Sequence, residues 1–182
     1  DSYLSKGYSI LILVPEISLT PQLQERFINR FGDNIGIYHS RQTPKQRFDL
    51  WQRARSGDIK IVIGTRSAVL CPLYNLGLII IDEEHDQSYK QHEGFRFSAR
   101  DVSIKRAQVE NIPIILGTAT PSLQTLKLVE DKKYKQTNML QRANGSNPPG
   151  FIILDINDTK LESGIAKESL DAIENTLNRN KQ

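Results

Sequence analysis

Residues 76–85 read Leu76-Gly77-Leu78-Ile79-Ile80-Ile81-Asp82-Glu83-Glu84-His85. The stretch is uncharged and mostly apolar until it ends abruptly in three carboxylates and a histidine. A continuous apolar run of this length, bounded by polar residues, is typical of a β-strand that is buried on both faces. We therefore predict a strand whose carboxyl end delivers acidic side chains into a cleft, where the Mg²⁺ of a bound triphosphate is a suitable ligand.

Four other apolar runs, rich in β-branched residues, recur along the chain. They are Ile10–Val14, Ile35–Tyr38, Ile59–Ile63 and Ile112–Leu116. The amphipathic stretches between them open with helix-capping signals at Thr20-Pro21, Thr43-Pro44, Ser98 to Asp101 and Thr120-Pro121. In the second of these helices we expect Phe48, Trp51 and Ala54 to face inward. Apolar strands that alternate with helices predict an α/β fold, with a parallel sheet covered on both faces.

The pattern changes after Lys132. Tyr134–Leu140 and Phe151–Ile156 are strand candidates, and residues 141–150 between them are rich in Asn, Gly and Pro, which is typical of a linker. Ala166–Asn180 has its leucines and isoleucine at helical spacing. We therefore expect residues 1–140 to form one lobe, and residues 141–182 to form a linker and the first helix leading toward a second lobe.

Composition limits the classes of partner and compartment. The formal net charge is +3 and the pI is about 9.0, a balance that permits a nucleic-acid partner without demanding one. The single cysteine, Cys71, excludes a disulfide framework and a cysteine-cluster zinc site within this chain, and favours a reduced cytoplasmic setting. No apolar run approaches the roughly 18 residues that a membrane span needs, so we expect no membrane partner.

Each predicted strand is followed at once by polar or otherwise specific residues. These are Pro15-Glu16, His39-Ser40, Gly64-Thr65-Arg66-Ser67, Asp82 to His85, and Gly117 to Pro121. In open parallel sheets, ligands bind beyond the carboxyl ends of the strands. We therefore expect these five segments to line one edge of the sheet and to share a function.

These segments resemble the motifs of the first motor lobe of superfamily-2 helicases, and most closely those of the primosomal helicases. Leu13–Gln22 is similar to motif Ia, Ile63–Ala68 to motif Ib, Ile81–Asp86 to a Walker B motif with DEEH in place of DEAH, Ser88–Asp101 to an aromatic-rich loop, and Ile115–Pro121 to motif III. The match extends from about Tyr8 to the end of the chain. The resemblance implies a RecA-like, P-loop NTPase fold.

The resemblance also implies roles in ATP hydrolysis. Asp82 would hold Mg²⁺ and Glu83 would polarise the attacking water, whereas we assign Glu84 no role. His85 would relay the nucleotide state through the coupling residues of motif III, which are Gly117, Thr118 and Thr120. Two simpler readings stay open, because a structural role is an alternative for His85 and a plain helix cap is an alternative for Thr120.

For DNA, the resemblance implies contacts from motif Ia, motif Ib and the aromatic-rich loop. The predicted DNA-binding residues are Pro15, Glu16, Thr20, Gln22, Thr65, Arg66, Ser67, Tyr89, Lys90, Phe95, Arg96, Phe97 and Arg100. Bases stack on aromatic rings with roughly 1–3 kcal/mol each, and the basic side chains suit phosphates. The alternative for Phe95 and Phe97 is that they fasten the loop to the lobe.

The function implied is that of an ATP-dependent 3′-to-5′ DNA helicase acting in replication restart and primosome assembly. Its cofactors would be ATP and Mg²⁺, with zinc bound only by cysteines outside this chain. Its partners would be single-stranded and forked DNA, the primosome and single-strand-binding proteins, in the nucleoid of a bacterial cytoplasm.

One departure from the family is large. A Walker A loop ends in Gly-Lys-[Ser/Thr], yet none of the 11 glycines precedes a lysine. We therefore expect a piece of lobe 1 that lacks the Walker A segment and is inactive alone. The alternative is a non-catalytic module that binds single-stranded nucleic acid or a protein. Two weaker alternatives are a nuclease built on Asp82 and Glu83, and a zinc site formed with His85 and His92, whose spacing matches no standard metal motif.

Overall fold

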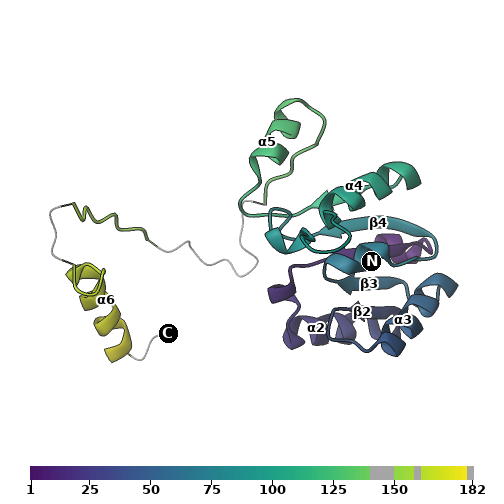
Figure 1. Cartoon of the computed structure of the whole chain (residues 1–182), viewed down its shortest axis with the longest axis horizontal. Helices are drawn as coiled ribbons and strands as arrows, with labels where there is room; N and C mark the ends of the chain where they lie inside the picture. The colour runs from purple at the N-terminus through teal and green to yellow at the C-terminus, as the bar shows by residue number, and fades with distance from the viewer. Residues whose placement is uncertain (140–149, 158–160, 180–182) are drawn as a thin grey trace. The chain divides into compact units, whose positions relative to one another are not determined.

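The computed structural model describes residues 1–139, 150–157 and 161–179. The chain divides into two compact units, Asp1–Gln136 and Thr137–Gln182. The first unit contains the whole sheet and all the segments that follow its strands (Figure 1). The assignment of the two units to a helicase lobe and a linker stays a prediction.

The first unit is built on five parallel strands, which confirms the predicted fold class. They are β1 (Ser9–Leu13), β2 (Ile35–Tyr38), β3 (Ile61–Gly64), β4 (Leu76–Ile81) and β5 (Ile114–Leu116), in the spatial order β2-β3-β1-β4-β5. The acidic strand β4 pairs with β1 on one side and β5 on the other. β2 and β5 therefore form the two edges of the sheet.

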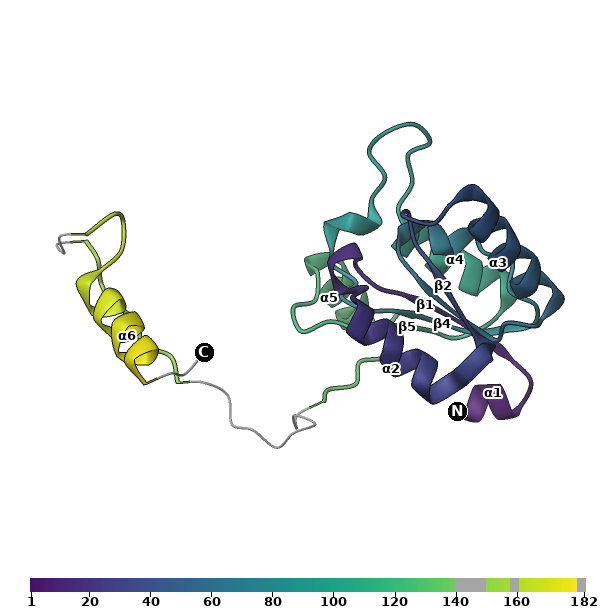
Figure 2. The same cartoon turned by 90° about the horizontal axis from the view of Figure 1, so that it is seen from below.

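Helices cover both faces of the sheet. Figure 2 shows α1 and α2 on one face, with α3 and α4 on the other. The α-helices of this unit are α1 (Ser2–Ser5), α2 (Pro21–Phe31), α3 (Pro44–Ser56), α4 (Ala99–Glu110) and α5 (Leu123–Glu130). The short 3₁₀ turns are η1 (Glu16–Ser18), η2 (Gly32–Asn34), η3 (Arg66–Leu70) and η4 (Gln87–Tyr89). This arrangement is the predicted three-layer packing.

Three of the four predicted helix starts are confirmed. The hydroxyl oxygens of Thr20, Thr43 and Ser98 each accept a hydrogen bond from a backbone N–H in the first turn of the helix that follows. The fourth prediction is wrong, because α5 begins at Leu123 and is capped by Ser122 rather than by Thr120. The Thr120 hydroxyl lies instead beside a histidine ring, as described below.

The core lies between the sheet and its helices. Leu11, Val62 and Ile79 on the three central strands are fully buried, as expected for strands covered on both faces. Gly64 ends β3 where the backbone of β2 comes close, and a β-carbon there would lie 2.3 Å from Tyr38 O. Only glycine therefore fits this strand end without moving the neighbouring strand.

Helix α3 contradicts one packing prediction. Leu50 and Ala54 are its buried residues, whereas Phe48 is 58% exposed and Trp51 is half-buried. Leu50 and Ala54, which are four residues apart, therefore define the face of α3 that packs on the sheet, and Phe48 lies on a different face. The helix consequently places an aromatic side chain on the surface.

The second unit contains α6 (Lys167–Asn178), with Ala166 as its N-cap residue. The predicted helix 166–180 is therefore correct in its centre, and its last residue lies outside the described range. The two predicted strands are wrong for the residues described, 134–139 and 151–156, which form no strand. A strand needs a neighbour for its backbone groups, and these segments pair with no strand in the described ranges. The predicted linker lies outside the described residues except for Gly150. Within the described part of the chain, no helix is both long and apolar enough to cross a membrane.

Candidate functional site

The carboxyl ends of β1, β4 and β5 meet at one edge of the sheet. Asp82 N donates to Leu13 O at 2.9 Å, and Gly117 N donates to Ile81 O at 2.8 Å. These two bonds continue the pairing of the strands by one residue beyond their ends. The segments that resemble motif Ia, Walker B and motif III are therefore held side by side, as the strand-end pattern predicted.

The three consecutive acids occupy three different environments. Asp82 is exposed, and its Oδ1 accepts a hydrogen bond from Glu83 N at 3.1 Å. Glu83 has a φ of +45°, a left-handed conformation that is uncommon for a residue other than glycine. This turn directs the next residue inward, so that Glu84 N donates to Gly117 O at 3.0 Å and Glu84 is only 2% exposed. Strained backbone of this kind is concentrated at functional sites.

Asp82 and Glu83 have the chemistry of a partial magnesium site. Neither carboxylate forms an ion pair with a lysine or arginine among the residues described. Mg²⁺ is usually held by one or two carboxylates together with the oxygens of a bound phosphate. The described residues contain no group of three or more His, Cys, Asp or Glu side chains placed to hold a metal ion. The pair therefore fits a cation that arrives with a phosphate better than a complete metal site.

His85 joins the acidic segment to the residues after β5. Its Nδ1 lies 2.8 Å from Thr118 Oγ1, and its Nε2 lies 3.3 Å from Thr120 Oγ1. Thr118 Oγ1 also accepts a hydrogen bond from Thr120 N at 3.0 Å. A threonine hydroxyl both donates and accepts, so either neutral tautomer of the ring is satisfied. The structure therefore places His85 in direct contact with Thr118 and Thr120, which are two of the three residues predicted to couple.

Glu84 forms a buried cluster that the sequence did not indicate. Its Oε2 accepts from Arg100 Nε at 2.6 Å, and its Oε1 accepts from Ser122 N at 3.0 Å. Arg100 Nη2 also donates to Thr125 Oγ1 at 2.9 Å. We call Glu84, Arg100, Ser122 and Thr125 the Glu84 cluster. It connects the end of β4 with the first turns of α4 and α5.

The Glu84 carboxyl is ionised despite its burial. Burial alone would raise its pKa, because it penalises the charged form. Hydrogen bonds from Ser122 N, Thr125 and Arg100, together with the charge of Arg100, outweigh that penalty and lower the pKa below its usual value. The cluster is therefore a buried ion pair whose hydrogen bonds are supplied by two helix starts.

Four residues predicted to bind DNA lie in the interior instead. Arg100 is 8% exposed in the Glu84 cluster, and Tyr89 is 1% exposed, with its hydroxyl donating to Asp82 O at 2.6 Å. Burial raises the pKa of the Tyr89 phenol, so it stays protonated and remains a donor. Pro15 and Thr65 are buried as well. Burial argues against DNA contacts from these four side chains, and the bonds of Tyr89 and Arg100 hold the acidic segment instead.

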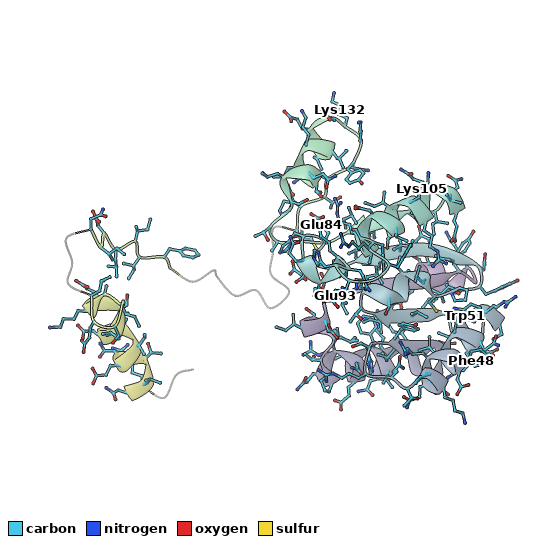
Figure 3. The ribbon with its side chains drawn as sticks, viewed as in Figure 1. Phe48, Trp51, Glu84, Glu93, Lys105 and Lys132 are labelled. Atoms are coloured by element: carbon cyan, nitrogen blue, oxygen red, sulfur yellow. The ribbon has the colours of Figure 1, made fainter. Side chains whose placement is uncertain are left out.

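The aromatic-rich loop is closed at its base and exposed at its tip. Lys90 and Ser98 form an antiparallel bridge, and Gln91 N donates to Phe97 O at 2.8 Å. Phe95 at the tip is 81% exposed, with its ring centroid 6.0 Å from that of Phe97. In Figure 2 the loop extends away from the sheet, and Figure 3 labels Glu93 within it.

The remaining predicted DNA contacts are partly engaged by the protein itself. Arg66 Nη1 donates to Lys90 O at 2.7 Å, so the motif Ib arginine supports the base of the aromatic-rich loop. Glu16 Oε1 accepts from Ser40 Oγ at 2.9 Å, and Thr20 caps α2. The other members differ only in exposure: Gln22, Lys90 and Arg96 are exposed, and Ser67 is half-buried.

Comparison with known proteins gives a consistent result. The profile of a family described as DEAD/DEAH box helicase matches residues 2–129. The chain is 42% identical over 182 residues to Replication restart protein PriA of Haemophilus influenzae, covering 100% of this chain and 25% of that protein. It is 37% identical over 186 residues to the Bacillus subtilis protein of the same name, covering 100% of this chain and 23% of that protein. The chain thus spans about a quarter of the length of these relatives.

Solved structures with a similar arrangement include the C-terminal part of the Fun30 ATPase domain and the Pyrococcus furiosus Hef helicase domain. The first has a TM-score of 0.44 at 17% identity and covers 74% of this chain and 42% of that one. The second has a TM-score of 0.39 at 10% identity and covers 70% of this chain and 26% of that one.

Proposed function

Because the chain belongs to the DEAD/DEAH box helicase family, we propose that it serves as the first motor lobe of an ATP-dependent 3′-to-5′ DNA helicase in replication restart. One observation carries the proposal. After β4, Asp82 is exposed, Glu83 has a strained backbone and Glu84 is buried. The histidine that follows them contacts two threonine hydroxyls beyond β5. This arrangement provides a catalytic edge and a link leading away from it.

Asp82 and Glu83 have separate tasks in this proposal. A bound Mg²⁺–ATP would supply the phosphoryl group and the positive charge that neutralises it. Asp82 is exposed beside Gly117 and would hold the cation. Glu83 turns its carboxylate to a different side through its left-handed backbone, where it would orient water and accept its proton.

His85 would report the state of the nucleotide site to the DNA-binding side. Its ring bridges Thr118 and Thr120, and its Nδ1 lies 3.7 Å from Glu83 Oε2. A small displacement of Glu83 would therefore change the contacts of a ring that also fixes the loop after β5. Such a discrete hydrogen-bond switch is a physical route for coupling between two sites.

DNA would be held by the exposed members of the predicted set. Phe95 is exposed and would stack on a base, while Lys90 and Arg96 would meet phosphates. Gln22 and the start of α2 would contact the sugar-phosphate backbone through polar groups that do not read sequence. Forked DNA, the primosome, single-strand-binding proteins and a bacterial nucleoid location belong to the same proposal, and they rest on the similarity to PriA.

We further propose that residues 1–182 alone do not turn over ATP, because no glycine among them precedes a lysine. Phosphate release measured with single-stranded DNA tests this. Clear DNA-stimulated turnover by this chain would contradict the claim. In a protein that joins this lobe to a phosphate loop, Glu83→Gln should abolish hydrolysis while DNA affinity is retained. The matched control is Glu25→Gln, an exposed acid on α2 that should leave turnover unchanged.

The missing phosphate loop also favours a second candidate, a module that binds single-stranded nucleic acid without chemistry. The two candidates differ in how they respond to nucleotide. If the chain is a helicase lobe, the protein that joins it to a phosphate loop should lose ATP hydrolysis on His85→Ala or Glu83→Gln. If the chain is a binding module, nucleotide should not change the DNA affinity of that protein or of either variant.

A further inference from the structure

We infer that a pocket between the end of β2 and helix α3 binds a base and an adjacent phosphate of single-stranded DNA. Its lining residues are Tyr38, Pro44, Arg47, Phe48 and Trp51. None of them lies in a segment that resembles a helicase motif. The inference rests on the proposed function, because it extends the proposed DNA path by one further contact.

The pocket combines aromatic rings with a guanidinium group. Phe48 and Trp51 are three residues apart on α3, where Figure 3 labels both, and Tyr38 adds a third ring from the end of β2. Phe48 is 58% exposed, and the Arg55 guanidinium lies 5.6 Å from the centroid of the Trp51 ring. The buried residues of α3 are Leu50 and Ala54, so the core does not require an aromatic ring at the exposed position Phe48. Rings of this kind suit base stacking, which tolerates any base.

The positive charge of the chain is concentrated in residues 41–55, which include four of the five residues that line the pocket. Residues 41–55 contain five basic side chains and one acidic side chain, a net charge of +4, whereas the whole chain carries +3, so all other residues together carry −1. The five are Arg41, Lys45, Arg47, Arg53 and Arg55, and none of them forms an ion pair with a described residue. A local excess of unpaired cations is the electrostatic footprint expected for a polyanion.

The pocket is continuous with the proposed DNA-binding edge. β2 is the neighbour of β3, and Thr65 N donates to Tyr38 O at 3.2 Å, so the motif Ib segment begins beside the pocket. The hydrogen bond from Ser40 to Glu16 links the same loop to motif Ia. A strand bound along these two segments therefore reaches the end of β2, where Tyr38 lines the pocket. This continuity favours DNA over an acidic protein segment as the occupant.

Trp51 is the single tryptophan of the chain, so its fluorescence reports on the pocket directly. Titration of residues 1–182 with an oligothymidine should quench Trp51 in step with the anisotropy of the labelled oligonucleotide. Phe48→Ala should weaken binding about fivefold or more, as expected for loss of a stacking ring. Arg47→Ala should lower the slope of log K against log salt by about 0.7, the value for one phosphate contact on a single strand.

Tyr74 provides the matched control. It is 59% exposed, carries Lys60 over its ring at 5.7 Å, and precedes β4, at the amino ends of the strands. Tyr74→Ala should leave DNA affinity unchanged. Circular dichroism and the melting temperature of each variant exclude unfolding as the cause of a lost signal, and Phe48→Tyr should restore binding.

The failures of the two proposals are distinguishable. If the oligonucleotide binds while Trp51 fluorescence and the Phe48→Ala affinity stay unchanged, the pocket inference is overturned and the proposed function stands. If no oligonucleotide binds, DNA binding by this lobe fails and the pocket inference fails with it. If only an acidic peptide quenches Trp51, the pocket is a protein-binding site and the inference is wrong.

Discussion

The Glu84 cluster and the aromatic-rich loop are neighbours in sequence but opposites in environment. The cluster is buried and ion-paired, whereas the loop is exposed at Phe95 and held to the protein only at its ends. Two buried residues near the ends of the loop explain the contrast. Tyr89 lies near its start and bonds to the backbone of Asp82, and Arg100 lies near its end and bonds to the side chain of Glu84.

Both ends of the loop are thus fastened to the acidic segment itself. The loop is therefore linked to Asp82 by one hydrogen bond and to Glu84 by one ion pair. The segment Tyr89–Arg100 therefore divides into an exposed tip and two interior anchors. Substitutions at the anchors should lower stability, whereas substitutions at the tip should weaken DNA binding.

Arg100→Ala should produce the largest effect on stability. The substitution leaves Glu84 buried without its cation, and breaking one partner of a buried pair typically costs about 3–5 kcal/mol. Urea denaturation measures the loss. The control is Arg30→Ala, which removes an exposed pair with Asp1 and should change stability by less than about 1 kcal/mol. Equal stabilities for the two variants would mean that the cluster does not hold the lobe together.

Tyr89→Phe should have the next largest effect. It removes the hydroxyl that donates to Asp82 O and leaves a partly buried carbonyl with one fewer donor, a cost of about 0.5–1.5 kcal/mol. The aromatic ring stays, so packing is preserved. Tyr74→Phe is the control, because Tyr74 is 59% exposed and its hydroxyl should be replaceable without loss. A Tyr89→Phe protein as stable as the wild type would show that this anchor is dispensable.

Acid should weaken the Glu84 anchor in a defined pH window. The pKa of Glu84 is lowered in the folded chain, so its stabilising contribution is complete above the unfolded value of about 4.3 and is lost as the pH falls through the lower folded pKa. Asp86 contributes in the same direction, because hydrogen bonds from Ser88 lower its pKa. Unfolding free energies measured below about pH 4 should fall less steeply in Glu84→Gln than in the wild type. Identical slopes would contradict the assignment.

The sequence was sufficient for the five strands of the sheet, for three of the four helix caps and for the grouping of polar segments at one edge of the sheet. The hydrophobic pattern of a strand and the capping residue of a helix are local features of the sequence. The strand before Asp82 and the helices that begin after Thr20 and Thr43 could therefore be predicted directly. The partners of Glu84 could not be predicted, because Arg100 and Ser122 are 16 and 38 residues away in the sequence. From the sequence, Arg100 was predicted to contact DNA at the surface. Only the fold shows that it pairs with the buried carboxylate of Glu84.

The orientation of α3 was missed for a related reason. Phe48 and Ala54 both fit an apolar stripe in sequence, yet Leu50 and Ala54 define the buried line. A helix with several aromatic and apolar positions has more than one plausible inward face, and the sheet beneath selects between them. The predicted strands after Lys132 failed because an apolar run forms a strand only where another strand accepts its hydrogen bonds.

Phe95→Ala should have the smallest effect on stability and a clear effect on DNA. The side chain is 81% exposed, so its removal should change the unfolding free energy by less than about 0.5 kcal/mol. The same change should weaken oligothymidine binding about fivefold, because one stacking ring is lost. Phe97→Ala is the informative partner, since Phe97 packs against the core and should cost stability as well. A loop in which Phe95→Ala alters neither DNA affinity nor DNA-stimulated hydrolysis would be structural at its tip as well as at its ends, and the division between tip and anchors would disappear.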